Sequence, residues 1–342
     1  MTKPPEKKTA AKKSPAKKRA AKKAPMSPQA LAREMMRLLT ERLGPDELIM
    51  PEDVNALINS LSGPSPNDRL SDAEADAKDE AQQIAFDAME AESEAEARKL
   101  AKRALRLDPD CVDALVVIND LDARSTREKI EGLQKAVAAG ERSLGAKFIR
   151  ENTGHFWMLI ETRPYMRAMA QLAGALFAEG LNLDAIRLYE KMLELNLNDN
   201  QGVRDPLLGA YLAVKDLDGA GRLLKKYEDD AMANFAWGRV LERFLAGDLA
   251  GASTALKKAR KANRFVELYM TAQKPIPKQI PEMYSPGSEE EAVLCMDGVG
   301  RAWAQHKEAV FWLLDQQEAD GRRGIPSKAA LKRVPVTGKK LQ

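Results

Sequence analysis

Small apolar side chains recur at helical spacing from residue 72 onward, and their pattern predicts pairs of packed helices. In AQQIAFDAMEAESEAEARKLAKRALRLDPD, residues 81–110, the first half places four apolar residues on one helix face: Ala81, Ile84, Ala85 and Ala88. The second half spaces three alanines before a proline: Ala97, Ala101, Ala104 and Pro109. Side chains this small let two antiparallel helices approach closely, so we expect a helix, a polar turn and a second helix.

The same pattern returns in three later stretches, 166–199, 202–229 and 234–263. The expected first helices bury Met169, Leu172, Ala173 and Leu176, then Leu207, Leu208 and Tyr211, then Ala236, Val240 and Phe244. The expected second helices follow turns near Gly180 and Gly247 and bury Ala185, Tyr189 and Met192, then Ala220, Leu224 and Tyr227, then Ala252, Leu256 and Ala259. The alanines at 185, 220 and 252 are 35 and 32 residues apart, which indicates one repeating unit.

These units resemble the tetratricopeptide repeat, a helix pair with a period of about 34 residues. The resemblance implies an all-α, tetratricopeptide-type α-solenoid over residues 72–317, in which the first helices line a concave surface. The stretch 112–145 resembles a further, degraded unit, and the number of true repeats between 112 and 165 stays open. A helical bundle without regular stacking is the alternative fold.

The segments on either side of the array have their own signals. Residues 26–71 predict two short helices and a linker, which are too small to form a core of their own. The Pro-rich run KPIPKQIPEMYSPG, residues 274–287, cannot be helical. After it, Ser288 and Glu291 predict a capping box, and we expect one capping helix that carries the following apolar residues: Val293, Trp303, Val310, Trp312 and Leu313.

Charge is segregated along the chain. Residues 1–25 carry ten Lys or Arg and one Glu, residues 321–342 carry seven Lys or Arg, and the body between them has a net charge of −13. We expect both ends, 1–25 and 318–342, to be disordered basic tails. The expected polyanion-binding residues are Lys7, Lys8, Lys12, Lys13, Lys17, Lys18, Arg19, Lys22 and Lys23. Such a tail, similar in composition to those of linker histones, suits nonspecific contact with nucleic acid, but it equally suits folding onto the acidic residues 72–96.

The run ENTGHFWMLIETRPYMRA, residues 151–168, concentrates the chemically active side chains. Pro164 predicts the first turn of a helix over 164–178, with Thr162 as its N-cap. His155 with Glu161 is the one pair that offers a base and an orienting acid, but on one helix they would lie about 120° apart. No nucleophile, phosphate-binding loop or zinc motif accompanies them, so we expect neither an enzyme nor a bound metal or cofactor.

A candidate partner-binding surface extends from this run into the turn Asn-Asp-Asn-Gln-Gly at 198–202. The stretch resembles bacterial tetratricopeptide proteins without assigned function and, distantly, the suppressor-of-tumorigenicity family, which shares that turn. The candidate residues are His155, Trp157, Glu161, Arg163, Arg167, Asn200, Gln201 and Arg204. Asn200 is expected to cap the next helix. The cationic and amide groups are expected to offer donors to an acidic partner segment, with structural packing as the alternative.

These observations predict a protein-interaction scaffold whose repeat array holds a protein or peptide partner while its basic tail contacts a polyanion. The alternative is a nucleic-acid-associated protein in which the tail is the binding element. We expect a cytoplasmic location, because the chain lacks a membrane-spanning apolar run and a secretory signal, and its two cysteines are far apart.

Overall fold

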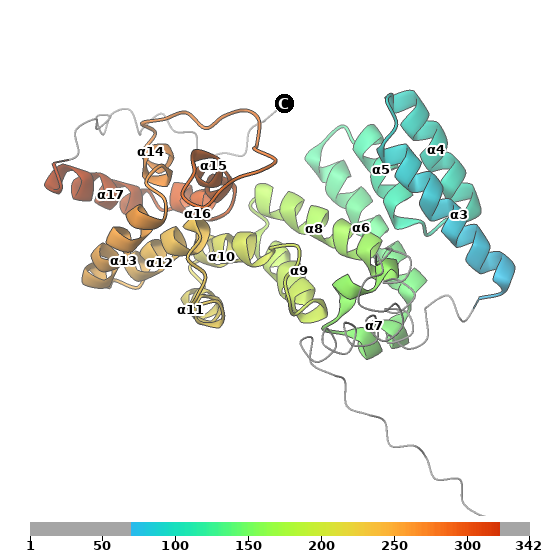
Figure 1. The fold of residues 1–342 in the computed structure, drawn as a ribbon, viewed down its shortest axis with the longest axis horizontal. Coiled ribbons are helices and arrows are strands. Elements are labelled where there is room, and N and C mark those ends of the chain that lie inside the picture. The colour runs from blue at the N-terminus through green and yellow to red at the C-terminus, as the bar shows by residue number, and fades with distance from the viewer. Residues whose placement is uncertain (1–69, 322–342) are drawn as a thin grey trace, which may run out of the picture. The chain divides into compact units, whose positions relative to one another are not determined.

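The computed structural model describes residues 70–321, and this part of the chain is helical (Figure 1). All of these residues belong to one compact unit. No strand occurs in this range, where an isolated bridge joins His155 to Asn196. The all-α prediction is confirmed for residues 70–321. The predictions for 1–25, for 26–69 and for 322–342 lie outside the described residues, whereas residues 318 and 319, expected to begin the C-terminal tail, belong to the last helix of this range.

Fifteen α-helices and two short 3-10 helices make up residues 70–321. They are α3 (Asp72–Met89), α4 (Glu94–Leu107), α5 (Val112–Asp122), α6 (Thr126–Leu144), α7 (Ala146–Asn152), η2 (Phe156–Met158), η3 (Ile160–Thr162), α8 (Arg163–Ala178), α9 (Asn182–Leu195), α10 (Arg204–Ala213), α11 (Leu217–Lys226), α12 (Ala233–Leu245), α13 (Leu249–Ala262), α14 (Val266–Met270), α15 (Glu289–Asp297), α16 (Val299–Gln305) and α17 (Lys307–Ala319).

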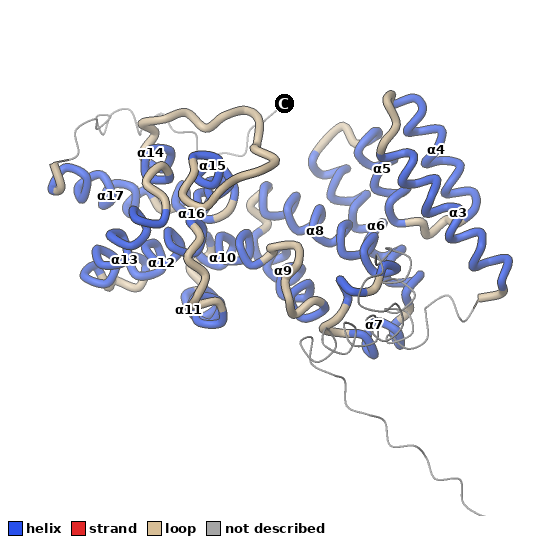
Figure 2. The backbone as a smooth tube through the Cα atoms, viewed as in Figure 1, coloured by secondary structure: helices blue, strands red, loops and turns tan. Residues whose placement is uncertain are grey.

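Helix packing follows one scheme from α3 to α13. The helices form five consecutive pairs, α3/α4, α5/α6, α8/α9, α10/α11 and α12/α13, whose members contact each other (Figure 2). The second helix of each pair contacts the first helix of the next pair, and each first helix also contacts the following first helix. The predicted succession of paired helices is therefore present in the described residues, and 112–145 forms one of the pairs.

Short polar signals fix where the helices begin. Asp216 and Asp248 cap α11 and α13, accepting hydrogen bonds from the backbone N–H groups of Gly219 and Gly251 at 2.8 Å each. Both caps belong to the same sequence, Asp-Leu-x-Gly. Because each side-chain oxygen satisfies an N–H group that has no partner inside the helix, these residues stop the preceding turn and start the second helix of the pair.

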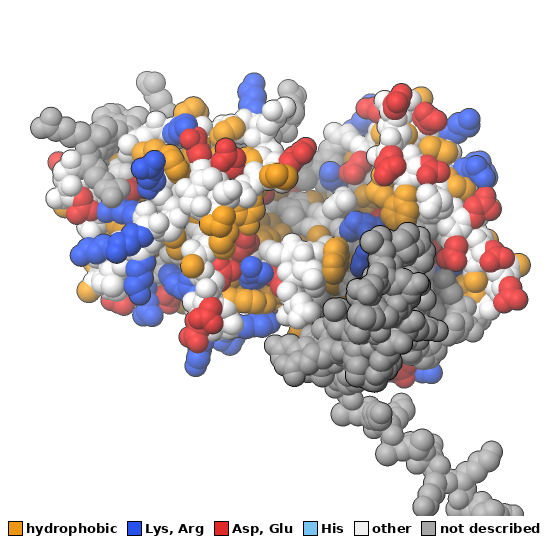
Figure 3. All heavy atoms as spheres, viewed as in Figure 1, with side chains coloured by type: hydrophobic (Ala, Val, Ile, Leu, Met, Phe, Trp, Pro, Cys, Tyr) orange, Lys and Arg blue, Asp and Glu red, His pale blue; other side chains and the backbone are white. Residues whose placement is uncertain are grey.

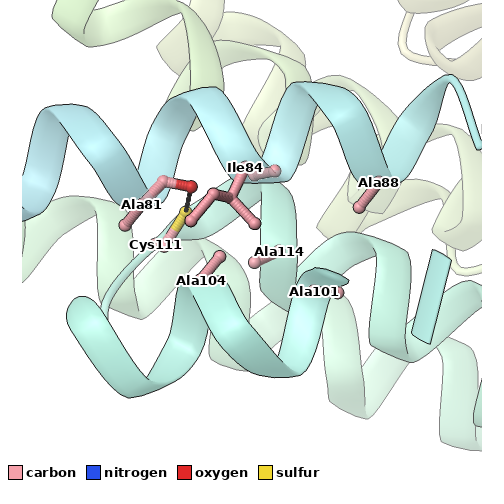
Figure 4. Packing of buried hydrophobic residues seen from close by; sticks show 8 residues of the cluster. Ala81, Ile84, Ala88, Ala101, Ala104, Cys111 and Ala114 are labelled. Carbon is pink, nitrogen blue, oxygen red and sulfur yellow. Dashed lines mark hydrogen bonds between the residues drawn. The ribbon is translucent and has the colours of Figure 1, made fainter. Parts of the chain in front are cut away.

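The first pair shows how the small side chains act (Figure 4). Its buried cluster consists of Ala81, Ile84, Ala85, Ala88, Ala101, Ala104, Cys111 and Ala114. The Cys111 thiol donates a hydrogen bond to the carbonyl oxygen of Ala81 at 3.7 Å, which ties the start of α5 to α3. The alanines predicted for the second helices are buried as well: Ala97, Ala185, Ala220, Ala252 and Ala259.

Helix α12 departs from the predicted face. Val240 is buried as expected, but Ala236 and Phe244 are only half-buried. Trp237 and Leu241 are fully buried instead, because α15 and α16 contact α12 from a side that the sequence pattern left unassigned. The helix therefore buries two sides, one against its own pair and one against the C-terminal end of the described chain.

The expected single capping helix is wrong, since the residues after the Pro-rich run form three helices. We call α15–α17, residues 289–319, the C-terminal segment. Its helices are interrupted at Gly298 and at His306, and α16 packs against α10 and α12. The capping box is half present. Ser288 accepts a hydrogen bond from the Glu291 N–H at 3.2 Å, but the Glu291 carboxylate accepts from Gly287 N–H at 2.6 Å instead of reaching Ser288.

Replacing Gly209 by alanine is expected to destabilise the fold by about 1–3 kcal/mol, because overpacking here pushes on backbone. A Cβ at position 209 would stand 2.7 Å from the carbonyl oxygen of Gly298. Urea unfolding of the full chain measures the change. Gly221→Ala in α11 is the matched control, since a Cβ there meets no heavy atom within 4 Å and should be neutral or slightly stabilising. Equal effects of the two substitutions would contradict the close packing.

Candidate partner-binding face

The run 151–168 folds as a packed corner between α6 and α8. It contains the end of α7, the two 3-10 helices and the start of α8. Phe156 is fully buried and meets the ring of Tyr165 edge-on, with 6.3 Å between ring centroids. Thr162 does not cap α8 as expected. Its hydroxyl group donates to the carbonyl oxygens of Leu159, at 2.7 Å, and Phe156, so it closes the corner itself.

The candidate residues of this corner separate into two places. His155 forms the bridge to Asn196 beside α9, and its Nδ1 atom is buried without a hydrogen-bond partner. Trp157 is half-buried, and its carbonyl oxygen accepts from Arg163 Nε at 3.2 Å while the guanidinium lies 5.6 Å from the ring centroid. Glu161 lies on the other side, where it lines a hollow with Arg163.

The turn at 198–202 has a capping role, but Asn200 does not perform it. Asn200 is exposed, whereas the buried Asp199 carboxylate accepts hydrogen bonds from the N–H groups of Val203 and Arg204, at 2.8 and 3.2 Å. The carboxylate is the stronger acceptor, and the turn directs it toward the first N–H groups of α10. Gln201 donates to the carbonyl oxygen of Met166 at 3.3 Å and joins α10 to α8.

Arg204 is engaged inside the protein. Its guanidinium pairs with the carboxylates of Asp199 and Asp230, both at 3.0 Å, and lies over the ring of Tyr227. The neighbouring Asp205 has a buried Oδ1 atom without a hydrogen-bond partner. Desolvation raises the pKa of Asp205 to about 7, opposed by Arg204 and reinforced by the charge of Asp230. The guanidinium donors of Arg204 are therefore used in contacts within the protein, which corrects the expectation that Arg204 offers them to a partner.

A hollow of about 240 Å³ lies where α3, the start of α5, the end of α6 and the start of α8 meet. The residues that line it include Lys78, Asp79, Gln82, Phe86, Asp108, Asp110, Ile160, Glu161, Arg163 and Arg167. The hollow thus gathers Arg163, Arg167 and Glu161 from the predicted set, and it does not include His155, Trp157, Asn200, Gln201 or Arg204.

Arg167 is held in a fixed position at the hollow. Its Nε atom donates to Oδ1 of Asp113 at 3.3 Å, and its Nη2 atom contacts Oδ2 of the same buried carboxylate. Gln82 Nε2 donates to that Oδ2 atom at 2.8 Å. The guanidinium also lies 5.8 Å from the ring centroid of Phe86. One carboxylate therefore joins three helices and aligns the cation with an aromatic ring.

Sequence reasoning missed the residues that α3 and α5 contribute, Gln82, Phe86 and Asp113. Gln82 and Arg167 are 31 and 54 residues from Asp113 along the chain, so no local motif joins them. The one available signal was that Asp79 and Asp113 are 34 residues apart, one repeat period.

The C-terminal segment packs against α10 and α12 through helix α16. The N–H group of Val299 donates to Asn234 Oδ1 at 3.0 Å, and Trp303 packs edge-on against Trp237 with 6.3 Å between centroids. The Nε2 atom of His306 lies 2.8 Å from the carbonyl oxygen of Leu212. Helix α16 is thus bound to two first helices through backbone, amide and aromatic contacts.

No protein-family model matches this chain, and no curated protein matches it. Between residues 70 and 321, no helix has the length and apolarity needed to cross a membrane. The same residues contain no group of three or more His, Cys, Asp or Glu side chains arranged to hold a metal ion. The assignment of a function therefore depends on the geometry of the helices.

Asp205→Asn is expected to stabilise the protein in a pH-dependent way. The pKa of Asp205 is raised, so the folded state holds a proton that the unfolded state releases between about pH 4 and pH 7. Wild-type stability therefore falls across this window and levels off above it. The variant should gain about 2–4 kcal/mol at pH 8 and about 1 kcal/mol or less at pH 4.5. Urea unfolding at several pH values measures this, with exposed Asp218→Asn as control. An equal gain at both pH values would be inconsistent with a buried, protonated carboxyl group.

Proposed function

We propose that this protein is a non-enzymatic interaction scaffold, a tetratricopeptide-type array that binds a protein partner on the side of α3, α5 and α8 where the hollow lies. The pairing scheme supports this proposal, since each first helix contacts the next first helix and each second helix contacts the following pair. The basic tail 1–25 adds contact with a polyanion.

The register of the repeats relates the hollow to the surface that the C-terminal segment covers. Equivalent positions in the pairs are found by counting back 18, 15 and 11 residues from a buried alanine of the second helix. In the first pair, counting back from Ala97 gives Asp79, Gln82 and Phe86. In the last pair, counting back 18 and 15 residues from Ala252 gives Asn234 and Trp237. In the pair before it, counting back 11 residues from Ala220 gives Gly209. We call the residues at these positions the first-helix face.

This register carries the proposal. At α10 and α12 the first-helix face contacts α16, through Asn234, Trp237 and Gly209. At α3 the same positions line the hollow. The face therefore already binds a helical segment of its own chain at one end, and none of residues 70–321 fills the hollow at the other. An equivalent segment from a partner protein suits that end.

The chemistry of the hollow indicates how a partner would bind. Phe86 and Ile160, which line the hollow, are 37% and 39% exposed, and Met89, three residues beyond Phe86 on α3, is 46% exposed, so a partner can bury apolar anchors at and beside the hollow. Lys78 and Arg163 supply cationic groups, while Asp79 supplies an acceptor. The mixed charge favours a partner surface with both signs, rather than the purely acidic segment that the sequence suggested.

Removing the apolar anchors tests this proposal. We expect Phe86→Ser with Met89→Ser to lower recovery of a nuclease-resistant, stoichiometric partner about tenfold or more, because apolar anchors contribute most of the binding free energy. Affinity capture of the full-length protein from its native cell, followed by quantitative mass spectrometry, measures recovery.

The matched control changes two exposed leucines outside the hollow, Leu183→Ser with Leu249→Ser, which are 63% and 51% exposed. This variant should retain the partner at the wild-type level. Loss of the partner with both variants, or with neither, argues against a specific site at the hollow.

The alternative, a nucleic-acid-associated protein, is favoured by the ten Lys or Arg residues within 1–25. Deleting these residues should abolish binding to a DNA duplex of random sequence and remove its steep dependence on salt, because each neutralised phosphate releases counterions. Fluorescence anisotropy over 50–300 mM salt measures both. If the deletion also removes the captured partner, the tail is the binding element and the scaffold proposal fails; if DNA binding persists, the tail is not the polyanion site.

A further inference from the structure

A small apolar cavity lies at the other end of the described chain, away from the hollow. Its volume is about 140 Å³, and it is lined by α14, the start of the Pro-rich run, α15, α16 and α17. The lining residues are Tyr269, Met270, Ala272, Ile276, Met296, Gly300, Trp303, Ala304, Lys307, Val310 and Phe311. Nothing in the proposed scaffold role uses this cavity.

One charged residue borders an otherwise apolar lining. Lys307 is exposed and has no ion pair with any residue of the described range. The other lysine nearby, Lys274, is paired with Glu289, and the Tyr269 hydroxyl donates to that same carboxylate at 2.5 Å. The polar groups around the cavity are therefore already satisfied, apart from the Lys307 ammonium group at its mouth.

The size of the cavity decides what it can hold. An apolar cavity of about 150 Å³ accepts a benzene molecule, whereas sites for drug-sized ligands usually exceed about 300 Å³. A volume of about 140 Å³ therefore suits one ring or one branched alkyl group. Anything larger must extend through the mouth, toward Lys307.

The walls of the cavity differ in rigidity. Trp303 is 1% exposed and fixed against Trp237, so the deep wall does not move easily. Met296 is flexible and lies close to Gly300, where its thioether can adapt to a guest. At the mouth, Ile276 is 53% exposed, and Ala272 has φ +55°, a left-handed conformation that non-glycine residues seldom adopt. Strained backbone of this kind is common beside ligand sites.

We propose that this cavity binds a small carboxylic acid, with one apolar ring or branched alkyl group inserted between α16 and α17 and the carboxylate held by Lys307. The apolar group replaces water on the buried walls, which supplies most of the affinity. The ion pair at the mouth selects an anion over a neutral molecule of the same shape. The cavity shares no lining residue with the hollow, so either proposal stands if the other fails.

Three probes on the full-length protein test the proposal. They are 3-(4-fluorophenyl)propionate, its neutral amide and N-acetyl-4-fluorophenylalanine, each followed by fluorine NMR line broadening. The free acid should bind, the amide should bind about threefold to fivefold more weakly, and the N-acetylated amino acid should bind no more tightly than the free acid. The last probe represents a peptide C-terminus.

Two variants locate the binding. Lys307→Met should lower the affinity for the acid to that for the amide, while Lys261→Met, at an exposed lysine outside the cavity, should change nothing. Ala304→Phe places a ring at the mouth from an exposed helix position and should weaken binding of the acid at least tenfold. Thermal unfolding of each variant verifies that it is folded.

Several results would overturn the assignment. They are absence of broadening with the acid, equal binding of acid and amide, or binding that Ala304→Phe leaves unchanged. Tighter binding of N-acetyl-4-fluorophenylalanine would assign the cavity to a peptide C-terminus instead of a free acid.

Discussion

The close approach of Gly298 to Gly209 is the constraint on which the C-terminal half of the described structure depends. Because neither residue has a side chain, the backbone at the start of α16 reaches the surface of α10. Asn234 then joins α10 to α16, because it donates to the Asp205 carbonyl oxygen at 3.1 Å and accepts from Val299 N–H at 3.0 Å. Once α16 is held there, Trp303 meets Trp237 and the C-terminal segment covers the end of the first-helix face. Whatever the protein binds on this face must therefore bind toward α3.

Buried carboxylates join helices that apolar packing alone would leave free to slide. Asp113 links α3, α5 and α8, while Glu291 accepts from Ala233 N–H at 2.8 Å and from Asn263 Nδ2 at 2.9 Å, linking α15 to the start of α12. A buried carboxylate that loses one partner costs several kcal/mol, so such contacts define a single register. Arg167, which pairs with Asp113, is consequently a structural residue first. Lys78 donates to Ser143 Oγ at 2.9 Å and Arg163 donates to the Trp157 carbonyl oxygen at 3.2 Å, and each cation has further N–H groups that a ligand can use.

The sequence predicted the parts of the fold that repeat, because a small residue every 32–35 positions imposes the same helix pair each time. It failed where the chain departs from repetition. Thr162 and Asn200 have suitable side chains for helix capping, but a buried corner uses Thr162, and Asp199, a stronger acceptor, lies next to Asn200. The three helices of the C-terminal segment were predicted as one, since the break at Gly298 depends on contact with α10 and not on local sequence. For the same reason Gln82 and Asp113 could not be identified as neighbours of Arg167.

The hollow and the small cavity are chemically opposite, and this difference limits what each can recognise. Beside the hollow, Gln82, Asp113 and Arg167 already bond to one another, so a partner gains little from them and must gain affinity from the exposed side chains of Phe86 and Met89 on α3. Figure 3 shows acidic side chains gathered over α3 and α4, which would repel a purely acidic partner. The walls of the cavity are apolar and the one lysine among its lining residues is Lys307. The shape of the cavity therefore selects the apolar group of the ligand, and the charge of Lys307 selects its carboxylate. A macromolecular surface suits the first arrangement, whereas a small acid suits the second.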